Sequence, residues 1–156
     1  MTTGSSGGFV LAFLAAFDAG DRVGVLVPGY PAYRNILKAL DVTVVPILAG
    51  PEQGFRLDPV CLPEVAAGLD GLIVASPANP TGTVVPPEDL AAIAAFCRRA
   101  GVRLIADEIY HGIAYPADLP TALAFSEDSI VVNSFSKYYA MTGWRVGWLV
   151  LPEDLA

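Results

Sequence analysis

Short apolar runs alternate along the chain with longer stretches that have the pattern of helices. The runs cover residues 23–27, 42–47, 72–75, 102–106, 130–132 and 146–151. Most of them are continuous rather than alternating, which is typical of parallel strands buried on both faces. The order of elements is therefore βαβα. It predicts an α/β fold with a mostly parallel, doubly wound sheet and helices on both of its faces.

The borders of the predicted elements carry further signals. The clearest helix covers residues 87–100, because prolines and acidic residues begin it, arginines end it and a glycine follows. These border residues are Pro86, Pro87, Glu88, Asp89, Arg98, Arg99 and Gly101. The connection 135–145 is short for a helical crossover, so we expect the last strand to run antiparallel to its neighbour.

A glycine-rich turn at residues 4–8 opens the first predicted helix, which should extend to about residue 19. Backbone N–H groups at such a helix start form an anion-binding site. In an open α/β sheet the turn usually follows a strand. Only residues 1–3 precede it here, so we expect that the preceding strand belongs to sequence upstream of this chain.

Composition narrows the class of protein. Of the 156 residues, 54% are apolar and 16% are charged. Counting Gly and leaving out Tyr raises the apolar share to about 60%, against a usual ~45–50%. This excludes a disordered chain, and no apolar run approaches the ~20 residues of a membrane span. The excess suggests that part of the surface faces other segments or a second subunit.

The charge and the cysteines exclude further classes. The net charge is −7 and no basic run occurs, so we expect neither a nucleic-acid surface nor a membrane partner. Cys61 and Cys97 are too few for a disulfide scaffold and lack metal-site spacing, so no metal is expected. Cys97 lies in the 87–100 helix and is expected to be a buried thiol. The N-terminal residues carry no signal-peptide pattern, which favours a cytoplasmic protein.

Polar side chains follow four of the predicted strands directly. They are Tyr30, Asn79, Asp107, Tyr110, Ser134 and Lys137. Ligands of open parallel sheets bind beyond the carboxyl ends of the strands, so these groups should meet at one edge. An anion cradle, an amine, a carboxylate and an aromatic face are the groups that a pyridoxal phosphate (PLP) site needs.

Three motifs make the comparison specific. Residues 79–82 read Asn-Pro-Thr-Gly, residues 107–110 read Asp-Glu-Ile-Tyr, and residues 134–147 contain Ser-Phe-Ser-Lys followed by Met-Thr-Gly-Trp-Arg-Val-Gly. In order and spacing they resemble the motifs of fold-type I PLP-dependent aminotransferases of class I/II. The resemblance covers essentially the whole chain, but only the middle of the family's usual length.

By this resemblance, Lys137 forms the Schiff base with PLP and then moves the substrate proton. Asp107 pairs with the protonated pyridine nitrogen, and Asn79 and Tyr110 hydrogen-bond the ring O3′ oxygen. Tyr30 stacks on the ring. The resemblance assigns the phosphate to Ser5, Ser6, Gly7, Ser134 and Arg145.

Each assignment has an ordinary structural alternative. Lys137 could be a surface lysine, Asp107 a helix N-cap and Tyr110 a packed core phenol. Asn79 and Tyr30 could belong to plain turns. Glu108 is expected to be a solvated or capping neighbour, and His111 a local polar contact.

The resemblance implies an enzyme that transfers an amino group from an L-amino acid to a 2-oxo acid, as a homodimer. Residues 1–156 are expected to be its PLP-binding large domain, truncated at both ends and without the small C-terminal domain. No position matches the family's substrate-carboxylate arginine, so we expect this part alone to be poorly active.

Other interpretations stay open. The same scaffold could serve a C–S β-lyase or a decarboxylase. It could also be the PLP-binding, aminotransferase-like domain of a transcription regulator, or a non-functional truncated product.

Overall fold

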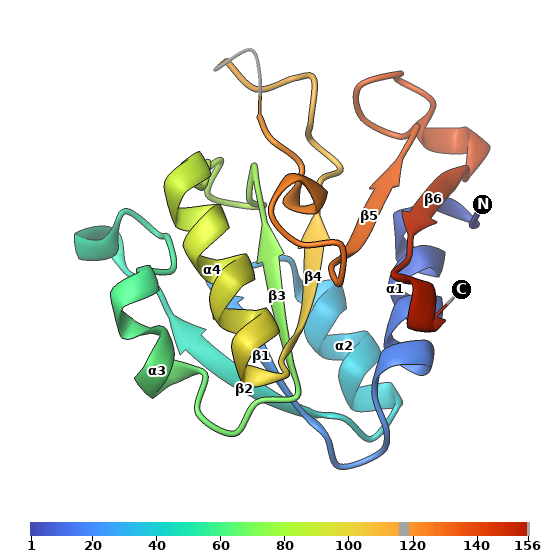
Figure 1. The fold of residues 1–156 in the computed structure, drawn as a ribbon. Helices are drawn as coiled ribbons and strands as arrows, with labels where there is room; N and C mark the ends of the chain where they lie inside the picture. The colour runs from blue at the N-terminus through green and yellow to red at the C-terminus, as the bar shows by residue number, and fades with distance from the viewer. Residues whose placement is uncertain (116–118, 156) are drawn as a thin grey trace.

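A six-stranded sheet organises the chain, in the order β2-β1-β3-β4-β5-β6 (Figure 1). The computed structural model describes residues 1–115 and 119–155. The strands are β1 Arg22–Val27, β2 Thr43–Leu48, β3 Gly71–Ala75, β4 Arg103–Asp107, β5 Ile130–Ser134 and β6 Gly147–Val150. β1 to β5 pair in parallel, and β6 runs antiparallel to β5. The predicted fold class and the antiparallel last strand are both confirmed.

Helices cover both faces of the sheet (Figure 1). The α-helices are α1 Gly4–Ala16, α2 Pro31–Ala39, α3 Leu62–Val65 and α4 Pro87–Ala100. Short 3₁₀ helices lie at Pro51–Gln53, Pro59–Cys61, Ala122–Ala124, Thr142–Trp144 and Glu153–Leu155. In the described part of the chain, no helix is long and apolar enough to cross a membrane.

Two apolar cores explain why the strands are continuous apolar runs. Successive strand residues point to opposite faces. In β4, Leu104 packs in the core beneath α3 and α4, whereas Ile105 packs in the core beneath α1 and α2. Both residues are buried. A central strand with helices on both sides therefore needs apolar side chains at every position.

The predicted helix 87–100 has the bounds that the structure gives α4, with Gly101 at φ +70° after its last turn. Cys97 is buried on this helix, and burial raises the pKa of its thiol to about 12. The first helix was predicted to reach about residue 19 but ends at Ala16, where Phe17 turns extended. The strands begin and end within two residues of their predicted limits.

Part of the unusually high apolar content of the chain lies on the surface of α1. Its inner side buries Phe9 and Phe13, yet Leu11 and Leu14 on its outer side are 52% and 58% exposed. A helix that is apolar on all sides is normally covered on all sides. The expectation that further segments or a second subunit cover this surface stays a prediction.

Candidate active site

One corner of the sheet joins the beginning of the chain to β6. The Thr2 N–H donates to the Gly147 carbonyl at 2.8 Å, and the Gly147 N–H donates back at 3.0 Å. A Cβ on Gly147 would lie 2.8 to 3.0 Å from backbone atoms of Gly4, Asn133 and Ser5. Only a glycine permits this approach. It brings the first turn of α1 against the end of β5.

The N-terminus of α1 is open to an anion. Its cap residue Thr3 makes no side-chain capping hydrogen bond. The Gly4 N–H donates to the Thr2 carbonyl at 3.0 Å, which leaves the next N–H groups of the first turn as donors for a ligand. The helix dipole places partial positive charge at the same point. The Arg145 guanidinium lies beside Gly4, so closely that a Cβ on Gly4 would overlap it. These donors together form a cradle for a phosphate group.

Arg145 is held in place by the loop that precedes it. Its backbone adopts the left-handed conformation, with φ +53°. Its Nη1 donates to the Thr142 carbonyl at 2.9 Å and to the Ser136 hydroxyl at 3.3 Å. The guanidinium therefore keeps a fixed direction, while its other N–H groups stay available for a ligand.

Asp107 ends β4 and is 5% exposed. Its Oδ1 accepts from the Ile109 N–H at 3.1 Å, and its Oδ2 accepts from the Tyr33 hydroxyl. Burial raises the pKa of Asp107 to about 6, although the hydrogen bonds from Tyr33 and Ile109 act in the opposite direction. Burial, followed by the charge of Asp107, also raises the pKa of Tyr33 well above its ordinary value.

Lys137 follows β5 on the same edge. Its Nζ lies 5.5 Å from the centre of the Tyr110 ring, which is within cation–π range. The side chain projects from an exposed loop and lines the same cavity as Asp107. An amine, a buried carboxylate and the anion cradle therefore share one hollow at the carboxyl edge of the sheet.

Eight of the ten predicted site residues line this cavity, which has a volume of about 120 Å³. They are Ser5, Ser6, Tyr30, Asn79, Asp107, Tyr110, Lys137 and Arg145. Gly7 and Ser134 do not line it. Ser134 is buried, and its hydroxyl accepts from the Ser136 N–H at 3.1 Å.

Three further residues line the cavity, namely Ile109, Ser136 and Thr142. Sequence reasoning missed all three, although Ser136 and Thr142 belong to the motif that contains Lys137. It also missed Tyr33, the partner of Asp107. Tyr33 lies three residues after Tyr30, and this helical spacing could have placed both rings on one face.

Of the two alternatives for Glu108, the solvated one is wrong, because the residue is 5% exposed. The capping one agrees with the structure, since Ala122 is the first residue of a short 3₁₀ helix. One carboxylate oxygen accepts from the Thr121 hydroxyl at 2.9 Å and from the Ala122 N–H at 2.7 Å. Its other oxygen lies 3.6 Å from Nδ1 of His111. Glu108 thus fastens the loop after β4 to the short helix at Ala122–Ala124, and His111 makes a local polar contact.

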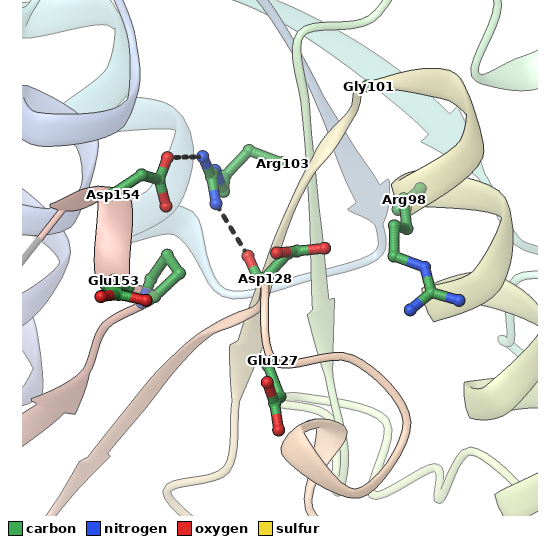
Figure 2. A pocket seen from close by; sticks show the side chains of 9 residues that line it. Arg98, Gly101, Arg103, Glu127, Asp128, Glu153 and Asp154 are labelled. Carbon is green, nitrogen blue, oxygen red and sulfur yellow. Dashed lines mark hydrogen bonds and ion pairs between the residues drawn. The ribbon is translucent and has the colours of Figure 1, made fainter.

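A wider hollow of about 630 Å³ opens at the other edge of the sheet, where β4 begins (Figure 2). Four acidic side chains and two arginines line it, and Arg103 bonds to both Asp154 and the Asp128 carbonyl. Ligands of open α/β sheets bind at the carboxyl edge. The smaller cavity is therefore the better candidate despite its volume.

The donor set at the carboxyl edge fits PLP. The phosphate would take the α1 N-terminus and Arg145, the aldehyde would take the Lys137 amine, and the pyridine nitrogen would take Asp107. Tyr30 offers an aromatic face at the same cavity. Fold and site together have the features of α/β proteins that bind a phosphorylated aldehyde cofactor beyond the carboxyl ends of their parallel strands.

Comparison with known proteins agrees. The family model "Aminotransferase class I and II" matches residues 1–156, and the chain belongs to this family, whose members depend on PLP. A valine–pyruvate aminotransferase of Mycobacterium tuberculosis is 60% identical over 99% of this chain and 40% of its own length. A probable aspartate/prephenate aminotransferase of Aquifex aeolicus is 35% identical over 94% of this chain and 39% of its own length.

Solved structures agree on the fold. An aminotransferase from Mycobacterium tuberculosis superposes with a TM-score of 0.95 at 60% identity, over 99% of this chain and 40% of that one. Aspartate aminotransferase from Thermus thermophilus with maleate gives 0.93 at 33% identity, over 99% of this chain and 41% of that one. The chain thus spans about two fifths of the length of the relatives it matches.

Proposed function

We propose that this chain is the cofactor-binding part of a PLP-dependent aminotransferase that moves an amino group from an L-amino acid to a 2-oxo acid. The observation that carries the proposal is the meeting of Lys137, Asp107 and Arg145 around one cavity at the carboxyl edge. Asp107 ends β4, whereas Lys137 and Arg145 lie in the connection between β5 and β6. A site that only held a phosphate group would need the cradle, but it would not need an amine and a buried carboxylate at the same cavity.

When bound, PLP withdraws electrons from the substrate carbon that carries the amino group. The residues of this chain have separate tasks around it. Arg145 and the first turn of α1 would hold the phosphate, and Asp107 would keep a proton on the ring nitrogen. Asn79 and Tyr110 would hydrogen-bond the ring oxygen, and Lys137 would attach the aldehyde and later carry the substrate proton.

The first substrates to test follow from the relatives. The 60% identical protein is named for valine and pyruvate, and others are named for aspartate and prephenate. Residues 1–156 would form the large domain, and side-chain selection would depend on parts of the enzyme beyond them. A cytoplasmic homodimer that acts in amino acid biosynthesis is part of the same proposal.

Borohydride reduction of the full-length protein with PLP tests the attachment point. Peptide mass spectrometry should then find the reduced cofactor on Lys137. Residues 1–156 contain one other lysine, the exposed Lys38 on α2. Lys38→Arg is therefore a matched control that should keep the label, whereas Lys137→Arg should lose it. Labelling of the Lys137→Arg protein at another lysine would contradict the assignment.

Product analysis tests the reaction. The wild-type protein with valine and pyruvate, and then with other pairs, should yield the new amino acid and the new oxo acid in equal amounts. Release of ammonia and pyruvate would instead indicate a lyase. Binding of PLP without turnover of any amino acid would favour a sensor domain.

A further inference from the structure

We propose that Tyr33 is a positioning residue of the site: its phenol fixes the Asp107 carboxylate while its ring fixes Tyr30. This inference rests on the proposed function and extends it to a residue outside the cavity wall. Tyr33 does not line the cavity that holds Lys137, Asp107 and Arg145. It acts on the cofactor position through the two side chains that do.

The ring of Tyr33 is packed between two elements. It meets Phe9 of α1 at a centroid distance of 4.9 Å and Tyr30 at 5.4 Å, both edge-to-face. The side chain is 4% exposed, in the first turn of α2. Edge-to-face packing restrains both rings. A movement of Tyr33 would therefore change the ring face that Tyr30 presents to the cavity.

The hydroxyl of Tyr33 has one clear task. It donates to Oδ2 of Asp107, across 74 residues of sequence. The other described donor to this carboxylate is the Ile109 N–H. Within residues 1–115 and 119–155, no lysine, arginine or histidine forms an ion pair with Asp107. Tyr33 is thus the side chain that supports the anion in the described structure.

The electrostatic surroundings of Asp107 make this support necessary. The titratable groups near it are Glu108, beside it in the chain, and the phenols of Tyr33, Tyr30 and Tyr110. Lys137 and Arg145 line the same cavity, but within the described residues neither forms an ion pair with Asp107. A buried carboxylate without an ion-pair partner depends on hydrogen bonds to keep its charge. Loss of the Tyr33 hydroxyl should let Asp107 hold its own proton, so that it no longer pairs as an anion with the ring nitrogen.

Tyr33→Phe is the direct test, because it removes one oxygen and keeps the ring packing. In the cofactor-free protein, carboxyl ¹³C NMR follows the Asp107 titration, with the resonance assigned by Asp107→Asn. We expect the midpoint to rise by about one pH unit, a tenfold change in proton affinity. In the PLP-bound protein with a ¹⁵N-labelled ring, the ring nitrogen should lose its proton at lower pH than in the wild type.

Further measurements distinguish this role from a merely structural one. Replacing Tyr33 with 3-fluorotyrosine makes the phenol a stronger donor, so the Asp107 midpoint should fall instead of rising. Tyr33→Phe should also lower kcat more than it raises KM, and it should have no added effect on the ring nitrogen in an Asp107→Asn background. A merely structural role would disturb folding, which near-ultraviolet circular dichroism reports. It would not raise the Asp107 midpoint in Tyr33→Phe and lower it in the 3-fluorotyrosine variant.

The two proposals fail in different ways. If PLP does not bind the wild-type protein, the proposed function is wrong, yet the cofactor-free titration still tests the Tyr33 contact. If PLP binds at Lys137 but neither variant moves the Asp107 midpoint or the ring-nitrogen titration, the role of Tyr33 is overturned.

Discussion

Replacement of Gly4 by alanine separates backbone strain from loss of the anion cradle. Gly4 has φ +72°, and an added Cβ would overlap the Arg145 guanidinium. Gly101 has a similar φ of +70°, but nothing lies within 4 Å of the position of its Cβ. The left-handed conformation costs an alanine about 1–2 kcal/mol relative to glycine. Both variants should therefore lose about the same free energy of unfolding, measured in urea.

Only Gly4→Ala should weaken cofactor binding. The guanidinium is the far end of a flexible side chain, so it will move away and relieve the overlap at the expense of its contact with the phosphate. A hydrogen bond to a charged group contributes about 1.5–3 kcal/mol, and 1.4 kcal/mol is tenfold in affinity. PLP affinity, followed by quenching of tryptophan fluorescence, should fall about ten- to a hundredfold in Gly4→Ala and stay unchanged in Gly101→Ala. Equal affinity in both variants would refute this account of the cradle.

Further predictions concern the glycine contact, the pH dependence and the loop after β4. Gly147→Ala should lower the free energy of unfolding by about 1–3 kcal/mol, because the added methyl group would press against backbone atoms that cannot easily move away. Gly143→Ala is the control and should not show this loss, because nothing lies within 4 Å of the position of its Cβ. In the cofactor-free protein, burial raises the pKa of Asp107 from 3.8 to about 6. Asp107 therefore stabilises the fold most at low pH, and this contribution is lost as the pH rises across that range. Urea unfolding at several pH values measures this pH dependence, and Asp107→Asn should abolish it. Glu108→Ala should cost about 1–3 kcal/mol, because the Ala122 N–H loses its buried acceptor, and thermal unfolding measures this loss.

The sequence predicted the sheet well because its signals are local. Continuous apolar runs fall within two residues of the observed strands, and Gly101 marks the end of α4. Residues that directly follow strands, such as Asp107 and Lys137, were also placed at the correct edge, because parallel strands present their carboxyl ends together.

The remaining features depend on contacts that no local pattern shows. Tyr33 reaches Asp107 from α2, and the burial of Glu108 depends on a loop that returns to it at Thr121. The position of Arg145 beside Gly4 follows from the closure of β6 against the first turn of α1. Such contacts become visible only when the path of the whole chain is known.

The hydrogen bonds between Thr2 and Gly147 join residues that are synthesised far apart in time. Domains fold as the chain emerges from the ribosome, beginning with the N-terminal part. The helix α1 precedes all six strands, but its packing partners β5 and β6 follow the other four strands in the sequence. Its inner residues Phe9 and Phe13 and its open N-terminus must therefore wait until these two strands have emerged. The anion cradle at this corner can therefore form only after β6 has been synthesised, so binding of an anion there would report a nascent chain in which β6 is already in place.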